Sequence, residues 1–495
     1  MKKYTKILVL IFLLTLAFRL YFAFQTPNLN HEAYYELRQV RSIKETGLPI
    51  FQDPLSYEGR TSLFSPIYHY FLALFSFIFP MTWILKIIPN ILASSLIIIN
   101  FLLAKKITRS QNASLFCAFI SAFIPIFITE TFNTSSIYSL LVPLTFLSLY
   151  FFMNIHKKKF LVYFLITAAF LIFIHPYSSL LVLGLIIYII SLSLEQLKSR
   201  KQETESVLFL TFLSIWIHLI LYKKAFLKHG PYVIWQNIPP AIMSLYFTQT
   251  NVLEAIIKIG LIPLIFGVYV IYRYIFKEKD KKIYLLASLA LALFFLVWFR
   301  LLQPNIAFIF LGTILAVLFA QGYGSFFRYL KTTKLAKHKN KFIVLFILVF
   351  IITSVIPSFY FSLEKVKQAP SKTDMQAFNW LKNNTEKDTV IAVSLKEGHI
   401  LNTITQRKNI LDTNFLLAPD PAERFDDLNT IYTSQYKTAA ISVLNKYDVK
   451  YILFSDSARS EFNIDQLNYL DDECFELIFD NKTKIYRSLC RVEEI

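Results

Sequence analysis

The first 362 residues of the chain alternate between long apolar runs and short polar connections. Apolar runs of about 17–25 residues have the length that crosses a bilayer as a helix. The pattern predicts eleven spans, at residues 4–24, 82–104, 112–129, 136–153, 160–174, 179–194, 207–225, 252–276, 283–299, 304–323 and 342–362. No such run follows, so we expect a helical membrane domain over residues 1–362 and a soluble domain over residues 363–495.

The C-terminal part has the alternation of a small α/β domain. Strands are predicted at Val390–Ser394 and Tyr451–Ser455, and helices at Ala422–Thr433 and Lys437–Tyr447. Thr373–Gln376 has the spacing of a capping box and predicts a helix that ends near Asn384.

Two cysteines, Cys474 and Cys490, flank a predicted β-hairpin with strands at Phe475–Phe479 and Lys484–Leu489. If the domain faces an oxidising exterior, the two residues can form a disulfide. The alternative is a pair of reduced thiols.

The distribution of charge predicts the orientation in the membrane. Residues 1–362 carry a net charge of +22 and residues 363–495 a net charge of −4. The basic excess follows the loops between spans, which is typical of membrane orientation and not of a nucleic-acid-binding face. Basic loops occur at every second connection: Lys2–Lys3, Lys105–Arg109, His156–Lys159, Lys198–Lys201, Lys277–Lys282 and Arg328–Lys341. The positive-inside rule therefore predicts a cytoplasmic N-terminus, an uncleaved first span and an extracytoplasmic C-terminal domain in the cell membrane.

Residues 62–79 are apolar enough for a further span, but counting them would place every later basic loop outside. We therefore expect a re-entrant or juxtamembrane helix that closes a large first outer loop, residues 25–81.

That loop holds five of the 12 acidic residues of the membrane half, among them Glu32. A carboxylate close to hydrocarbon is costly to desolvate and is often functional. At Glu32 a group-transfer enzyme would need a carboxylate to take a proton from an acceptor, or to hold a divalent cation such as Mg or Mn. The alternative is a solvated acid that begins a helix over residues 31–46.

Four other residues are further candidates for a functional site. Glu130 ends the third span on the outer side, where the alternative is an interfacial acid that reaches water. Arg300 ends the ninth span on the outer side, and a guanidinium suits a phosphate ligand, although a lipid headgroup is the alternative. His175 precedes Pro176 and is a candidate ligand-binding residue, where the alternative is a hydrogen bond at a helix end. His31 would join Glu32 and Glu130 as a metal ligand, where the alternative is a loop histidine without that role.

The first loop resembles that of the GT-C membrane glycosyltransferases. Glu32-Ala33-Tyr34-Tyr35-Glu36-Leu37-Arg38 is similar to the Asp-Pro-Trp-Phe-Asn-Tyr-Arg stretch of oligosaccharyltransferase catalytic subunits, so Glu32 falls on the catalytic Asp. His31–Tyr35 resembles the Asp-Glu-Ala-Tyr-Tyr of protein mannosyltransferases and lipid A aminoarabinose transferases, and Tyr57–Arg60 resembles the Tyr-Pro-Leu-Gly-Arg that closes the loop.

The resemblance implies a glycosyltransferase that takes sugar from a polyprenyl-phosphate carrier to an extracytoplasmic protein, lipid or glycan. We expect Glu32 and Glu130 to be catalytic, Arg300 and Arg60 to bind phosphate, and Tyr34 and Tyr35 to stack on the sugar. The alternative for Arg60, and for Arg38, is an ion pair with the acids of the same loop. The Trp-Trp-Asp-Tyr-Gly motif of oligosaccharyltransferases is missing, and Thr248–Asn251 stands where that family has Thr-Ile-x-Glu. These departures favour transfer of a single sugar from a polyprenyl monophosphate.

Two other functions are the alternatives. A transporter or flippase of lipid-linked sugar would carry charges inside its spans and an inverted repeat, and the sequence has almost no mid-span acids and no visible repeat. An inactive scaffold of the same fold would bind carrier without forming product. The sequence leaves open which sugar and acceptor would be used and whether the outcome is inverting or retaining.

Overall fold

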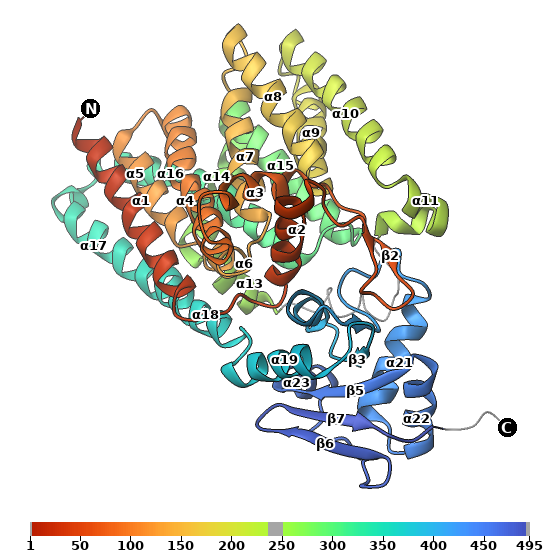
Figure 1. The fold of residues 1–495 in the computed structure, drawn as a ribbon. Coiled ribbons are helices and arrows are strands. Elements are labelled where there is room, and N and C mark those ends of the chain that lie inside the picture. Colours follow the sequence, from red (N-terminus) through yellow and green to blue (C-terminus); the bar gives the residue numbers. More distant parts are fainter. Residues whose placement is uncertain (1, 236–250, 492–495) are drawn as a thin grey trace. The chain divides into compact units, whose positions relative to one another are not determined.

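The computed structural model describes residues 2–235 and 251–491 (Figure 1). The chain divides into two compact units. The first comprises Met1–Gln25, Ile84–Leu221 and Phe247–Val366, and the second comprises Thr26–Trp83, Tyr222–Tyr246 and Lys367–Ile495. The second unit therefore combines most of the predicted first outer loop with the C-terminal segment. The predicted domain boundary after residue 362 stays a prediction, and most of Thr248–Asn251 lies outside the described residues.

The first unit is helical. Its elements are α1 (Lys2–Ala23), α4 (Met81–Thr108), α5 (Gln111–Ala122), α6 (Pro125–Thr131), α7 (Tyr138–Phe152), α8 (Lys158–Ile174), η1 (Pro176–Ser178), α9 (Ser179–Leu194), α10 (Lys201–Leu221), α13 (Val252–Ile259), α14 (Leu261–Arg273), η3 (Tyr274–Glu278), α15 (Lys281–Trp298), α16 (Pro304–Lys331), η4 (Lys334–His338), α17 (Lys339–Phe350), η5 (Ile351–Val355) and α18 (Ile356–Lys367). Each of the eleven predicted spans overlaps helix.

Within the described residues, seven helices are long and apolar enough to cross a membrane, or nine if each of two bent helix pairs is one span. The other two predicted spans form α7 and α8, which have 15 and 17 residues. The count of eleven therefore stays a prediction. The segment at residues 62–79 forms only α3 (Ile67–Ser76), whose ten residues are about 15 Å long and too short to cross the hydrocarbon.

Two predicted spans are not straight. The segment predicted at 252–276 bends by 94° between α13 and α14, at Gly260, whose φ of 98° suits only glycine. The segment predicted at 112–129 bends by 49° between α5 and α6. Pro125 at the start of α6 lacks a backbone N–H, so it can begin a helix but cannot continue one. Both bends lie in uniformly apolar sequence, so the apolar pattern did not predict them.

Close helix contacts in the first unit depend on small residues. A Cβ atom on Gly267 of α14 would lie 2.5 Å from the Leu315 side chain of α16, and one on Gly184 of α9 would lie 2.7 Å from Leu289 of α15. Glycine lets these helix backbones approach, as is typical of packing inside membranes.

Several of the basic loops of the first unit contact one another. Lys282 donates its Nζ to the Lys106 carbonyl at 3.1 Å, Lys106 donates to Asn154 Oδ1 at 2.5 Å, and Lys279 pairs with Glu195 at 2.7 Å. These contacts join four loops that were predicted to share one side. That this side is cytoplasmic stays a prediction.

The second unit mixes helices and strands. Its elements are α2 (Ala33–Thr46), β1 (Gln52–Asp53), β2 (Arg60–Thr61), α3, α11 (Lys223–His229), η2 (Gly230–Trp235), α19 (Lys372–Asn384), β3 (Val390–Ala392), α20 (Gly398–Ile400), η6 (Leu401–Thr405), β4 (Lys408–Asn409), α21 (Pro421–Thr433), α22 (Lys437–Lys446), β5 (Val449–Phe454), α23 (Asp456–Phe462), β6 (Phe475–Asp480) and β7 (Lys484–Ser488). The predicted strands, helices and hairpin of the C-terminal segment are confirmed within one to two residues at most ends.

The capping box of α19 was predicted at the wrong residue. Ser371 is the N-cap; its hydroxyl accepts from the Asp374 backbone N–H, and the Asp374 carboxylate accepts from the Ser371 N–H in return. An acid at the third helical position completes the box as Glu or Gln would, so the helix begins at Lys372.

The five strands of the main sheet run in the order β4-β3-β5-β7-β6, with α22 and α23 packed on β5 (Figure 1). β4, β3 and β5 are parallel, while β7 is antiparallel to both β5 and β6. The first loop extends this sheet, because Ser56 forms a parallel bridge with Asn409 at the β4 edge. A disulfide joins Cys474 to Cys490 across the β6–β7 hairpin.

Candidate functional site

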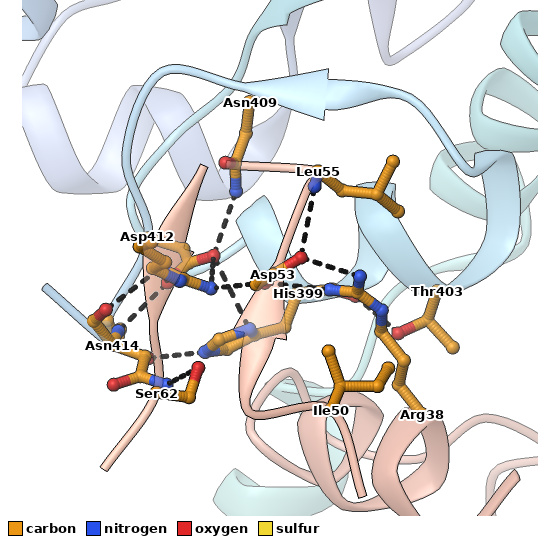
Figure 2. A network of polar contacts seen from close by, with 12 residues as sticks. Arg38, Ile50, Asp53, Leu55, Ser62, His399, Thr403, Asn409, Asp412 and Asn414 are labelled. Carbon is orange, nitrogen blue, oxygen red and sulfur yellow. Dashed lines mark hydrogen bonds and ion pairs between the residues drawn. The ribbon is translucent and has the colours of Figure 1, made fainter. Parts of the chain in front are cut away.

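A buried network of charges connects the first loop to the C-terminal segment inside the second unit (Figure 2). Asp53 and Arg60 are direct cross-strand partners in the β1–β2 ribbon, and Arg60 donates to Asp53 Oδ2 at 2.9 Å. The same guanidinium donates to both oxygens of Asp412, one of them at 2.7 Å, although the two residues are 352 positions apart. Arg38 of α2 holds Asp53 through two hydrogen bonds, of 3.0 and 2.7 Å. The result is two guanidiniums matched by two carboxylates.

The electrostatics keep this network ionised despite its burial. Burial is the largest single influence and alone would raise the pKa of Asp412, but the charge of Arg60 and the hydrogen bonds from Arg60 and Asn409 contribute to lowering that pKa below its ordinary value. For Asp53 burial is likewise outweighed, by Arg38 and then Arg60, and its pKa is lowered. Paired, hydrogen-bonded charges of this kind are the ones that a protein interior tolerates.

An aromatic and histidine cluster lies next to the network. The Tyr35 ring packs against the rings of His399, Phe64 and His69, with centroids 5.1, 5.8 and 6.1 Å apart. His69 Nε2 lies 2.6 Å from a carboxylate oxygen of Glu36. His399 Nδ1 lies 3.6 Å from Asp412, yet burial is the larger influence and lowers the pKa of His399, which favours its neutral form. Burial also raises the pKa of the Tyr35 phenol.

An open cleft of about 570 Å³ adjoins the same residues. Asp53, Glu58 and Arg60 from the β1–β2 ribbon line one part of it, and Leu417 and Pro419 line another. Asp53 and Arg60 therefore belong to both the cleft and the buried network.

Other predicted residues of the first loop lie at the start of α2. Glu32 is exposed at the N-cap position and its side chain caps no helix N–H. His31 is half-buried and its carbonyl accepts from the Tyr34 N–H at 3.2 Å. Tyr34 is buried, with its hydroxyl 3.7 Å from the Met375 sulfur. A buried Tyr34 ring positions α2 and has little face to offer a sugar.

The remaining predicted residues belong to the first unit. Glu130 is half-buried near the end of α6, and Arg300 is exposed just after α15 with a positive φ of 55°. His175 Nδ1 accepts from the Tyr177 N–H at 3.1 Å, which makes His175 the cap of η1. The meeting of Glu32 with Glu130 and Arg300 in one pocket stays a prediction, because Glu32 belongs to the other unit.

One polar centre of the first unit escaped prediction. Arg19 of α1 is only 2 % exposed; its Nε donates to Asn90 Oδ1 at 3.0 Å and a second nitrogen donates to Thr131. Its guanidinium also lies 5.4 Å from the centre of the Phe127 ring. The signal available in the sequence was a lone arginine inside an apolar span. The residues missed in the network, His399 and Asp412, stand beside the apolar Ile400 and Leu411 and carried no local signal.

The residues described within residues 2–235 and 251–491 contain no group of three or more His, Cys, Asp or Glu that could hold a metal ion. A metal site formed by Glu32, Glu130 and His31 stays a prediction, because Glu130 belongs to the first unit and the other two residues belong to the second.

No protein-family model and no curated protein sequence matches the chain. Its fold, however, is similar to solved structures. One is the archaeal oligosaccharyltransferase AglB from Archaeoglobus fulgidus, in complex with an inhibitory peptide and a dolichol-phosphate: the TM-score is 0.69 at 16% identity over 91% of this chain and 69% of that chain. The same enzyme in complex with Zn and sulfate gives a TM-score of 0.62 at 15% identity, over 90% of this chain and 67% of that chain.

A second solved protein matches over nearly its whole length. ArnT from Cupriavidus metallidurans, bound to undecaprenyl phosphate, gives a TM-score of 0.59 at 9% identity over 98% of this chain and 99% of that chain. Both neighbours are GT-C superfamily membrane glycosyltransferases. The expected GT-C fold is therefore confirmed, while at these identities the likeness concerns the fold alone.

Proposed function

We propose that the protein is a membrane glycosyltransferase that moves a sugar from a polyprenyl-phosphate carrier to an extracytoplasmic acceptor. The observation that carries this proposal is the fold, which is that of two enzymes solved with dolichol-phosphate and undecaprenyl phosphate. A fold alone supports many chemistries, so the proposal also needs a reactive residue. Glu32 meets that need, because it is an exposed carboxylate at the start of a helix that the second unit holds in place.

In the proposed reaction an acceptor O–H or N–H attacks the anomeric carbon of the carrier-bound sugar. A new bond forms between the acceptor and that carbon while the bond from the carbon to the phosphate oxygen breaks. Glu32 takes the acceptor proton, and the polyprenyl phosphate leaves with the electron pair. Glu130 would assist Glu32, and Arg300 would stabilise the phosphate charge.

The contacts in the second unit change the roles expected for two residues. Arg60 already faces Asp53 and Asp412, which neutralise its charge, so we assign it to holding the first loop and leave the phosphate to Arg300. Tyr34 and Tyr35 are assigned to positioning α2, since the Tyr34 ring is buried and the Tyr35 ring is packed against His399.

The test is transfer of labelled sugar from a polyprenyl-phosphate carrier in membranes that contain the protein. Glu32→Gln should lower transfer by about 100-fold or more, as expected for loss of a general base. Glu45→Gln is the matched control, because Glu45 is an exposed acid on the same helix and should leave transfer unchanged. Undiminished transfer by Glu32→Gln would reject the assignment. Carrier uptake without covalent transfer would instead indicate a flippase, and carrier binding without product an inactive scaffold.

A further inference from the structure

The segment of residues 222–235, here called the basic aromatic segment, exposes an unusual amount of apolar surface. It comprises α11 and η2 in the second unit. Leu227 is 76 % exposed, Tyr232 69 %, Ile234 47 % and Trp235 40 %. Four large apolar side chains exposed within nine residues form the kind of patch that marks a contact with a membrane or another molecule.

The charge of the segment points to the nature of that contact. It contains Lys223, Lys224 and Lys228 and no acidic residue, and all three lysines are exposed. Lysines interleaved with leucine, tyrosine and tryptophan are typical of segments that lie in the interface of a bilayer. Lysine ammonium groups attract the acidic headgroups, while the aromatic rings enter the boundary between headgroups and acyl chains.

The position in the chain fits the same reading. The candidate span α10 ends at Leu221, and α11 begins at Lys223. Ile220, one residue before that end, is 57 % exposed, as expected of a side chain that faces lipid. On the predicted topology this end of α10 is extracytoplasmic. Three lysines there run against the positive-inside trend, and an anionic lipid surface would account for them.

The segment is also fastened to the C-terminal part of the second unit. Lys228 donates its Nζ to the Ala418 carbonyl at 2.9 Å, and His229 Nε2 bonds the Leu416 carbonyl at 2.7 Å. Leu417, between these two carbonyls, lines the 570 Å³ cleft. A bilayer contact made by the segment would therefore affect the position of the cleft wall at Leu417.

We propose that the basic aromatic segment is an interfacial anchor that docks the second unit on the anionic surface of the bilayer. Lys223 and Lys224 bind phosphate or carboxylate groups of acidic lipids, and Leu227, Tyr232 and Trp235 insert beside them. The proposal does not depend on sugar transfer, so its test is independent of the test of the proposed function.

The experiment uses the full chain in lipid nanodiscs, with tryptophan kept only at position 235. The other four tryptophans, Trp83, Trp216, Trp298 and Trp380, are replaced by Phe. In discs of phosphatidylcholine and phosphatidylglycerol, lipids brominated high on the acyl chain should quench the Trp235 emission by about half or more. The matched control keeps only Trp380, which packs against Tyr451 and Phe479 in the second unit and should stay unquenched.

A second arm tests the charge. Lys223→Gln with Lys224→Gln should remove most of the extra quenching that phosphatidylglycerol gives over phosphatidylcholine alone, since each lysine near an acidic surface strengthens binding about fivefold. Lys372→Gln with Lys387→Gln, two exposed lysines of the second unit, is the control and should change nothing. The proposal is overturned if Trp235 is quenched by aqueous acrylamide as freely as by bromolipid. It is equally overturned if both quenchers fail, which indicates that the protein itself covers Trp235, or if inorganic phosphate alone reproduces the effect of the acidic lipid.

Discussion

Replacing Asp412 by Asn should loosen the contact between the first loop and the C-terminal segment. Asp412 is fully buried and accepts from Arg60, from Asn409 Nδ2 at 3.0 Å and from the Asn414 N–H at 2.9 Å. Asn has the same shape but no charge. The change leaves the guanidiniums of Arg38 and Arg60 to share the single carboxylate of Asp53.

The cost follows from the burial. Removing one partner from a buried ion pair typically costs about 3–5 kcal/mol, because the remaining charge is left uncompensated. In a unit of this size each kcal/mol lowers the midpoint of thermal unfolding by about 2–4 °C, so the second unit should unfold roughly 10 °C earlier. Asp426→Asn, an exposed acid on α21, is the control and should shift the midpoint by no more than about 2 °C.

Hydrogen exchange followed by mass spectrometry gives the local measurement. Peptides that cover residues 52–62 and 408–415 should lose protection together in Asp412→Asn, since Ser56 bridges Asn409 and Arg60 binds Asp412. The pH dependence of the stability of the second unit tests the same charge. The folded-state pKa of Asp412 is lowered, so its contribution is fully present above the unfolded value of about 4 and is lost as the pH falls through the folded-state pKa. The variant should lack this acid sensitivity. If it keeps wild-type stability and exchange, the network does not hold the loop.

Three further outcomes test other parts of the chain. Burial raises the pKa of Glu397 to about 7, so its charged form destabilises the folded state at higher pH. Glu397→Gln should therefore raise the unfolding midpoint of the second unit, measured by calorimetry, at pH 8 but not at pH 5. An equal gain at both pH values would contradict this. Replacing both Cys474 and Cys490 by Ser opens a loop of 16 residues and should cost about 3 kcal/mol in chemical unfolding, and reductant should then have no further effect on stability. Arg19→Ala should destabilise the first unit by about 3 kcal/mol in detergent, because it leaves a cavity beside Asn90. Arg19→Met fills that space and should cost less than half as much. Equal losses of stability in the two variants would point to the lost charge instead.

The helices and the C-terminal strands were predictable because they depend on local patterns. Apolar length located the long apolar helices of the first unit, and the Cys474–Cys490 hairpin was visible from alternation and a turn. The bends at Gly260 and before Pro125 were missed because hydropathy does not register backbone geometry. Both breaks had a local cause in the sequence that the apolar count outweighed.

The buried network was not predictable in the same way. Arg60 and Asp53 are close in sequence and alternate across a ribbon, so their pairing had a local basis. Asp412 had none, because nothing near it indicates a partner 352 residues away. Its burial depends on two segments packing together, and single-residue propensities carry no information about such packing.

The second unit contains both Glu32 and the C-terminal segment, so that segment has a part in any chemistry at Glu32. Helix α2 follows Glu32 directly, and it is held from the C-terminal side: Thr403 donates its hydroxyl to the Tyr34 carbonyl at 3.0 Å, and Arg41 donates to the Thr403 carbonyl at 3.4 Å. A reactive carboxylate must be held within about 0.5 Å of its working position by groups that are themselves fixed. Because Arg38 on the same helix is anchored through Asp53 to Arg60 and Asp412, the segment after residue 366 supplies rigidity to the helix that follows Glu32.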